Sequence, residues 1–120
     1  MRQTVPVATF DDVRRVALSL PDASEPAGDG KFVVAGKAFA WPWLERIHPK
    51  RARVPSNEVV AVRVAHEDEK GALIDLDPAV FFTEPHYDGY PAVLVRLAPL
   101  DEPKLRVILT DGWKARPRRR

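Results

Sequence analysis

Residues 83–98 constrain the fold more than any other segment, because a rigid turn leads directly into a strand. Pro85 and Pro91 fix the backbone on both sides of Gly89, which can adopt a positive φ. From Ala92 to Ala98 every residue except Arg96 is apolar, and the odd and even positions would fall on opposite faces. The sequence therefore predicts a strand over 92–98 whose entry is set by the turn.

The remaining patterns predict three helices and several short strands. Thr9 followed by two acids indicates a helix start, and apolar residues at helical spacing continue to Pro21. Acids open a second helix over 67–76, and Asp101 begins a third that ends near Gly112. Strands are predicted over 31–35, 38–41 and 58–65, with a short one near 82–83.

Three connections are predicted between these elements. Gly36 and Lys37 form a hairpin turn, and Asp77-Pro78 starts one helical turn over 79–81. Residues 42–57, with three prolines, form a long connection, because proline limits the preceding strand.

Short hairpin links and alternating strands favour an α+β fold with a single antiparallel sheet of about five strands. Three main helices are expected to pack mainly on one face. A chain of 120 residues is one domain by size, predicted over 1–113, with a basic C-terminal tail over 114–120.

Charge is unevenly distributed along the chain. The formal net charge is +2, but the last seven residues hold five of the 19 Lys and Arg. The remaining 14 face 17 Asp and Glu, a net charge of −3. A folded nucleic-acid-binding domain usually has a basic face, so the acidic balance of the body counts against one.

Composition excludes several classes of function. The absence of cysteine excludes disulfides and thiolate chemistry. His48, His66 and His86 lack the spacing of zinc or iron ligands, so neither a metal nor another cofactor is expected. No signal-peptide pattern or membrane-length apolar run is present, which predicts a cytoplasmic protein without membrane association.

Several motifs, taken in order, resemble the MmcQ/YjbR family of small bacterial proteins. They are Thr9-Phe10-Asp11-Asp12-Val13-Arg14 with Leu18-Ser19-Leu20-Pro21, Gly36-Lys37-Ala38-Phe39-Ala40, Asp77-Pro78 with Phe81-Phe82, the segment 83–97, and a last helix ending at Trp113. The resemblance implies a compact α+β fold with an antiparallel sheet, outlined like frataxin or secretion chaperones. Because members are commonly described as DNA-binding, it also implies a non-enzymatic DNA-binding function.

The turn itself offers one candidate site. Its two prolines would hold His86, Tyr87 and Tyr90 in fixed directions, where they could stack on a ring and exchange a proton or hydrogen bond. The alternative is purely architectural, with the rings packed over the end of the sheet. His86 beside Glu84 or Asp88 does not by itself indicate acid–base catalysis, so no catalytic residue is assigned.

Basic residues supply the candidate DNA contacts. Lys50, Arg51 and Arg53 could bind phosphates without reading sequence, with Trp43 nearby for stacking. Arg116, Arg118, Arg119 and Arg120 of the tail would add affinity for any polyanion. The alternative for both segments is a solvated charge run without a partner.

Two further expectations concern strand residues. Trp41 is expected in the core, because its strand also carries Phe39 at the alternate position. Arg63 and Arg96 have similar positions on their strands, and on one shared face they would line a shallow anion-accepting surface. The leading function is therefore sequence-independent DNA binding, and the alternative is a small-ligand or protein-interaction module centred on His86, Tyr87 and Tyr90.

Overall fold

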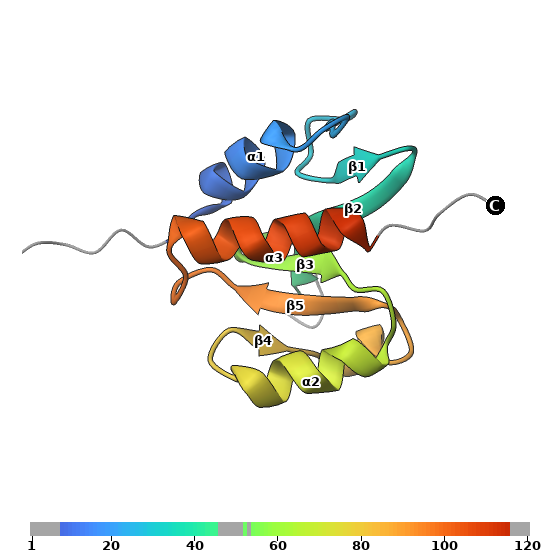
Figure 1. Ribbon diagram of the computed structural model, residues 1–120, viewed down its shortest axis with the longest axis vertical. Coiled ribbons are helices and arrows are strands. Elements are labelled where there is room, and N and C mark those ends of the chain that lie inside the picture. Colours follow the sequence, from blue (N-terminus) through green and yellow to red (C-terminus); the bar gives the residue numbers. More distant parts are fainter. Residues whose placement is uncertain (1–7, 46–51, 53, 116–120) are drawn as a thin grey trace, which may run out of the picture.

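The computed structural model describes residues 8–45, 52 and 54–115 (Figure 1). Its elements follow one another in the order helix, three strands, helix, short strand, single 3₁₀ turn, strand, helix. They are α1 (Phe10–Ser19), β1 (Phe32–Val34), β2 (Lys37–Glu45), β3 (Val54–Arg63), α2 (Asp68–Leu76), β4 (Phe81–Phe82), η1 (Pro85–Tyr87), β5 (Ala92–Arg96) and α3 (Glu102–Lys114).

The five strands form one antiparallel sheet in the order β1-β2-β3-β5-β4, which confirms the predicted α+β class. Helices α1 and α3 lie side by side over one face of the sheet, and α2 lies beside the edge strand β4 (Figure 1). The main core fills the space beneath α1 and α3, where side chains of even-numbered residues in β3 pack beside those of odd-numbered residues in β5. Its largest fully buried side chains include Phe32, Phe39, Leu105 and Leu109.

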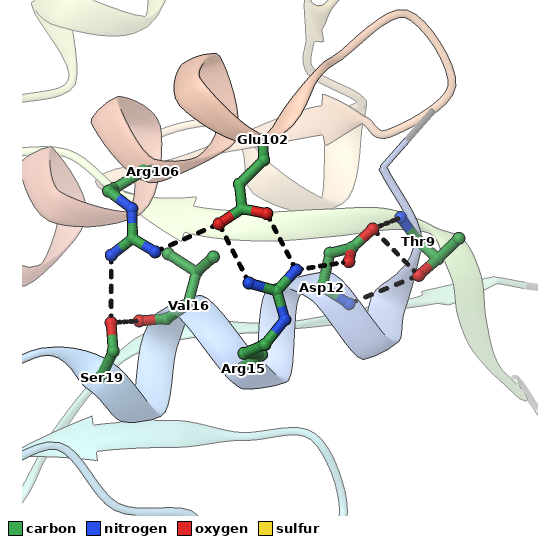
Figure 2. A network of polar contacts seen from close by, with 7 residues as sticks. All are labelled: Thr9, Asp12, Arg15, Val16, Ser19, Glu102 and Arg106. Atoms are coloured by element: carbon green, nitrogen blue, oxygen red, sulfur yellow. Dashed lines mark hydrogen bonds and ion pairs between the residues drawn. The ribbon is translucent and has the colours of Figure 1, made fainter. Parts of the chain in front are cut away.

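Local sequence rules explain how α1 begins and how it meets α3. Thr9 caps α1 by accepting the backbone N–H of Asp12, whose carboxylate accepts the Thr9 backbone N–H at 2.9 Å in return. Arg15 then joins Asp12 to Glu102 of α3, and Arg106 also donates to Glu102 (Figure 2).

These contacts lower the pKa of two carboxyl groups. The Thr9 backbone N–H is the largest cause for Asp12, and the Arg15 guanidinium is the largest for Glu102. Because Arg15 and Glu102 are about half exposed, the network aligns the two helices more than it stabilises them.

The predicted connection over 42–57 is wrong at both ends, since β2 continues to Glu45 and β3 begins at Val54. Pro42 of β2 and Pro55 of β3 are tolerated because each is paired with a neighbouring strand on one side only. Pro42 pairs with Val60 beyond the last β1 pair, and Pro55 pairs with Leu44 beyond the last β5 pair.

A β-bulge in β2 changes which side chains enter the core. Phe32 pairs with Ala40 but Val33 pairs with Ala38, so Phe39 has no partner on β1. Phe39 and Ala40 are therefore both buried in the main core, although they are consecutive. The alternation resumes one residue out of step, and Trp41 turns to the opposite face, which corrects its predicted core position.

Smaller differences concern turns and helix ends. The first hairpin turns at Ala35 and Gly36, which both have positive φ, and not at Gly36 and Lys37. Residues 78–80 form the predicted single turn, in which the backbone N–H groups of Val80 and Phe81 both donate to the Asp77 carbonyl oxygen, but the turn ends where β4 begins at Phe81. Lys114, assigned above to the tail, lies in the last turn of α3, and Gly112 is buried inside that helix. Among the described segments, every helix is too short or too polar to cross a membrane.

Candidate functional site

The sheet face opposite α1 and α3 carries a second apolar cluster, which we call the aromatic face. Val59, Ala61 and Leu94 are buried at its centre. Four rings cover them, contributed by β2, β4 and the turn before β5: Trp41, Trp43, Phe82 and Tyr87. Aromatic side chains therefore replace helices as the cover on this side of the sheet.

A cleft of about 530 Å³ opens beside this cluster, where the end of the β2–β3 hairpin meets the segment 84–90. We call it the aromatic cleft. Its walls combine four rings, four apolar side chains and two charged residues: Trp41, His86, Tyr87 and Tyr90; Ala38, Pro42, Leu44 and Pro55; Asp29 and Lys31. The structure thus brings together His86, Tyr87 and Tyr90 around one concave surface, as the ligand-binding alternative requires.

The segment 84–90, called here the 84–90 turn, is shaped first by Glu84. This residue precedes η1, and its Oε1 accepts the His86 backbone N–H at 3.0 Å. Its Oε2 accepts the Trp43 indole N–H at 3.2 Å, which joins the turn to β2. Pro85 occupies the first position of η1, where no backbone donor is needed.

Helix α2 holds the other end of the same turn. Lys70 is 4% exposed, and its Nζ donates to the carbonyl oxygens of Tyr87 at 2.6 Å and Tyr90 at 2.9 Å. One helical turn earlier, Glu67 Oε2 accepts the Gly89 backbone N–H at 2.6 Å. Lys70 is the sole buried residue of α2, so this polar contact is the main way the helix meets the 84–90 turn.

The rings of the aromatic cleft fix one another. Trp41 Nε1 donates to the Tyr87 hydroxyl at 3.1 Å, a bond between residues 46 positions apart. Tyr90 packs edge-on against both Trp41 and Tyr87, with ring centroids about 6 Å away in each pair. Arg63 Cζ lies 5.9 Å from the centroids of Trp41 and Tyr90, and its Nε donates to the Ala38 carbonyl.

Arg63 and Arg96 lie on the same face, as the hypothesis of a shared surface required. In the β3–β5 register Arg63 pairs with Ala92 and Arg96 pairs with Val59, so both project on the side of Leu94. They stand at opposite ends of the strand pair, and Arg96 lies over Phe82, 4.1 Å from its centroid. Of the two arginines, Arg63 is the one beside the aromatic cleft.

The side chains that line the cleft are suited to holding a ligand. It offers flat apolar surfaces, the His86 imidazole and two side chains of opposite charge at Asp29 and Lys31. Within the described ranges, no three His, Asp or Glu side chains gather closely enough to hold a metal ion. Glu84, one of the two acids that stand two residues from His86, accepts a backbone N–H and an indole N–H.

Seven of the predicted site residues lie outside the described part of the chain: Lys50, Arg51, Arg53, Arg116, Arg118, Arg119 and Arg120. Three of them fall between Glu45 and Val54, two residues that pair across the β2–β3 hairpin. Neighbouring residues of that hairpin, Leu44 and Pro55, line the aromatic cleft.

Sequence reasoning missed much of the cleft wall. Leu44 and Pro55 were assigned to a connection, and Lys31 was predicted in a strand but precedes β1. Asp29 lies in a loop that sequence alone does not place. The sequence did contain a signal for part of the cleft wall, since an unusually apolar run is formed by Trp41, Pro42, Trp43 and Leu44. The bulge at Phe39, which turns Trp41 to the aromatic face, has no such signal, and neither has the register shift between Pro42 and Leu44.

Three mycobacterial proteins are similar to this chain, each named only as an uncharacterised protein: Rv2570 and MT2646 of Mycobacterium tuberculosis and Mb2600 of Mycobacterium bovis. Each is 42% identical over 113 residues, which covers 89% of this chain and 87% of the relative. No family model matches the chain, and no solved structure matches it. The resemblance to MmcQ/YjbR proteins therefore stays a prediction.

Proposed function

The chain belongs to the family of the mycobacterial proteins Rv2570, MT2646 and Mb2600, and we propose that it is a non-enzymatic protein that binds a small organic molecule with a flat ring. The site is the aromatic cleft. The observation that carries the proposal is the convergence of His86, Tyr87, Tyr90 and Trp41 around one cavity of about 530 Å³.

The size and lining of the cleft suit such a ligand. Pockets for small molecules measure roughly 300–1,000 Å³ and are lined mainly by apolar and aromatic groups with a few polar ones. Here Pro42 and Pro55 add rigid apolar surface, and Asp29 and Lys31 supply charge. A planar ring would gain both burial and ring–ring contact with Tyr90, which is 43% exposed before binding.

A second support for ligand binding is that the walls of the aromatic cleft are already held in place without a ligand. The Trp41–Tyr87 hydrogen bond and the two bonds from Lys70 fix the walls before any ligand arrives. Binding then costs little ordering of side chains, which is a condition for useful affinity at a small site. Purely architectural packing would not require a concave, partly exposed ring surface.

An NMR titration with indole tests the proposal. Indole is expected to shift the amide signals of Ala38, Tyr87 and Tyr90 in a saturable way. The Tyr90→Ala variant should lose this response, whereas Val107→Ala, which removes an apolar side chain 60% exposed on α3, should keep it. Shifts that do not saturate at millimolar indole, or that persist in Tyr90→Ala, would contradict the proposal.

Sequence-independent DNA binding is the second candidate, and one observation favours it. The basic segment with Lys50, Arg51 and Arg53 is tied at both ends to the β2–β3 hairpin beside the aromatic cleft. Bases could stack in the cleft while this segment contacts phosphates. The resemblance to MmcQ/YjbR proteins points in the same direction.

A salt titration separates this candidate from an effect of the tail. Fluorescence anisotropy would measure binding of single-stranded and duplex DNA to the whole chain and to a chain ending at Ala115, which keeps α3 complete. If the folded domain binds DNA, the shortened chain retains salt-dependent affinity. Loss of all binding at low salt would assign the affinity to Arg116, Arg118, Arg119 and Arg120.

A further inference from the structure

We propose that the ligand of the aromatic cleft carries a negatively charged group, such as a carboxylate or phosphate, attached to its flat ring. This inference rests on the proposed function and adds the charge of the ligand to it.

The carboxylates around the cleft are occupied by the protein itself. Glu84 accepts from the His86 backbone and the Trp43 indole, and Glu67 accepts the Gly89 backbone N–H. Asp29 supplies the sole carboxylate among the described residues that line the cleft, and its Oδ1 accepts the backbone N–H of Lys31 at 3.2 Å. Each of these acids therefore shapes the backbone around the site.

The cations are less engaged. Lys31 lines the cleft and is exposed. Arg63 lies 5.9 Å from the centroids of two lining rings, Trp41 and Tyr90, and its Nε donates to the Ala38 carbonyl. In the described part of the chain neither residue forms an ion pair. Their charges are thus available to attract an anion into the cleft.

The arginine also disfavours a cationic ligand. Aromatic rings attract cations, so a cluster of Trp41 and Tyr90 could in isolation suit an ammonium group. Here the Arg63 guanidinium already lies 5.9 Å from both ring centroids and would repel a second positive charge. Ring stacking combined with an anionic group agrees with the positions of Arg63 and Lys31, whereas Asp29 is the carboxylate among the described lining residues that opposes it.

Three probes with the same ring test the charge preference: indole-3-acetate, indole and tryptamine. Their dissociation constants would be measured by NMR titration at low ionic strength, where exposed charges are least screened. The expected order of affinity is indole-3-acetate, then indole, then tryptamine. A tighter fit for tryptamine than for indole-3-acetate would overturn the inference.

Two substitutions with opposite expected effects sharpen the test. Lys31→Gln should weaken indole-3-acetate binding up to about fivefold, the range of an exposed ion pair, and leave indole unchanged. Asp29→Asn keeps an oxygen for the Lys31 backbone N–H and should strengthen indole-3-acetate binding. Lys104→Gln, an exposed lysine on α3, is the control and should change neither.

The outcomes separate this inference from the proposed function. If indole binds at the cleft but the acid and the amine bind equally, the ligand charge is wrong and the binding function stands. Equal effects of Lys31→Gln on indole and indole-3-acetate lead to the same conclusion. If none of the three probes binds in the cleft, the proposed function itself is wrong.

Discussion

Lys70 offers the sharpest prediction, because a buried ammonium group connects α2 to the wall of the aromatic cleft. Its Nζ donates to the carbonyl oxygens of Tyr87 and Tyr90. The Lys70→Met substitution keeps the apolar stem and removes both bonds. We expect it to destabilise the fold and to loosen the 84–90 turn.

The magnitude follows from the partners that remain. Hydrogen bonds to a charged group contribute about 1.5–3 kcal/mol each. However, the Tyr87 carbonyl also accepts the Tyr90 backbone N–H, and the Tyr90 carbonyl accepts that of Ala92, so neither oxygen is left without a donor. Removal of a buried charge also recovers its desolvation cost, so we expect a net loss of about 2 kcal/mol.

Urea unfolding followed by circular dichroism would measure this loss, and hydrogen exchange would locate it. A loss of 2 kcal/mol corresponds to a fall in melting temperature of roughly 8 °C for a domain of this size. Exchange should accelerate most at Tyr90 and Ala92, whose N–H groups bond within the turn. The control Lys104→Met should stay within about 0.5 kcal/mol. Unchanged stability, or faster exchange spread evenly over the sheet, would refute this account of Lys70.

Three further predictions concern the scaffold. Gly112→Ala should lower the free energy of unfolding by about 1–2 kcal/mol, because its new Cβ would lie 2.5 Å from Val62 Cγ1. Gly71→Ala, whose new Cβ would have no atom within 4 Å, should raise the free energy of unfolding by up to about 1 kcal/mol. Urea titrations of both variants would measure these changes. Ala35→Asn should raise the melting temperature, because Ala35 has a φ of 52° that asparagine tolerates better, and an unchanged or lower value would contradict this. The Arg14 guanidinium donates to Glu25 and lowers the pKa of that carboxyl, so the contribution of Glu25 to folding stability is present above its usual pKa near 4.5 and is lost as the pH falls through the lower folded value. Glu25→Gln should therefore flatten the fall in stability below pH 4.5, and a slope equal to that of the parent chain would count against this.

Local signals in the sequence predicted the scaffold well. The Thr9 cap, the strand that starts at Ala92 and the Asp101 start each depend on neighbours within a few positions. The structure has all three, although β5 ends at Arg96, two residues before the predicted end. The strand ends at Glu45 and Val54 were not predicted, because Pro42 and Pro55 usually stop strands. They are tolerated here only because β1 and β5 end before reaching them, which is a property of the whole sheet.

The candidate site was predicted only in part, for a related reason. His86, Tyr87 and Tyr90 stand close together in the sequence, so their proximity needed no tertiary information. Trp41 joins them because a bulge at Phe39 turns it to the aromatic face, and its bond to Tyr87 spans 46 positions. Strict alternation places Trp41 on the same face as Phe39, and it cannot predict a bulge that inserts one extra residue into the strand.

We propose above that a flat ring binds in the aromatic cleft, where it would lie against Trp41 and Tyr90. Intermolecular nuclear Overhauser effects between indole-3-acetate and the protein test it most directly, since they report which side chains touch the ring. We expect contacts from the ring protons of indole-3-acetate to Trp41 and Tyr90, and to the Pro42 or Pro55 methylenes. Binding whose contacts lie on any other surface, or no contacts at saturating ligand, would contradict the account.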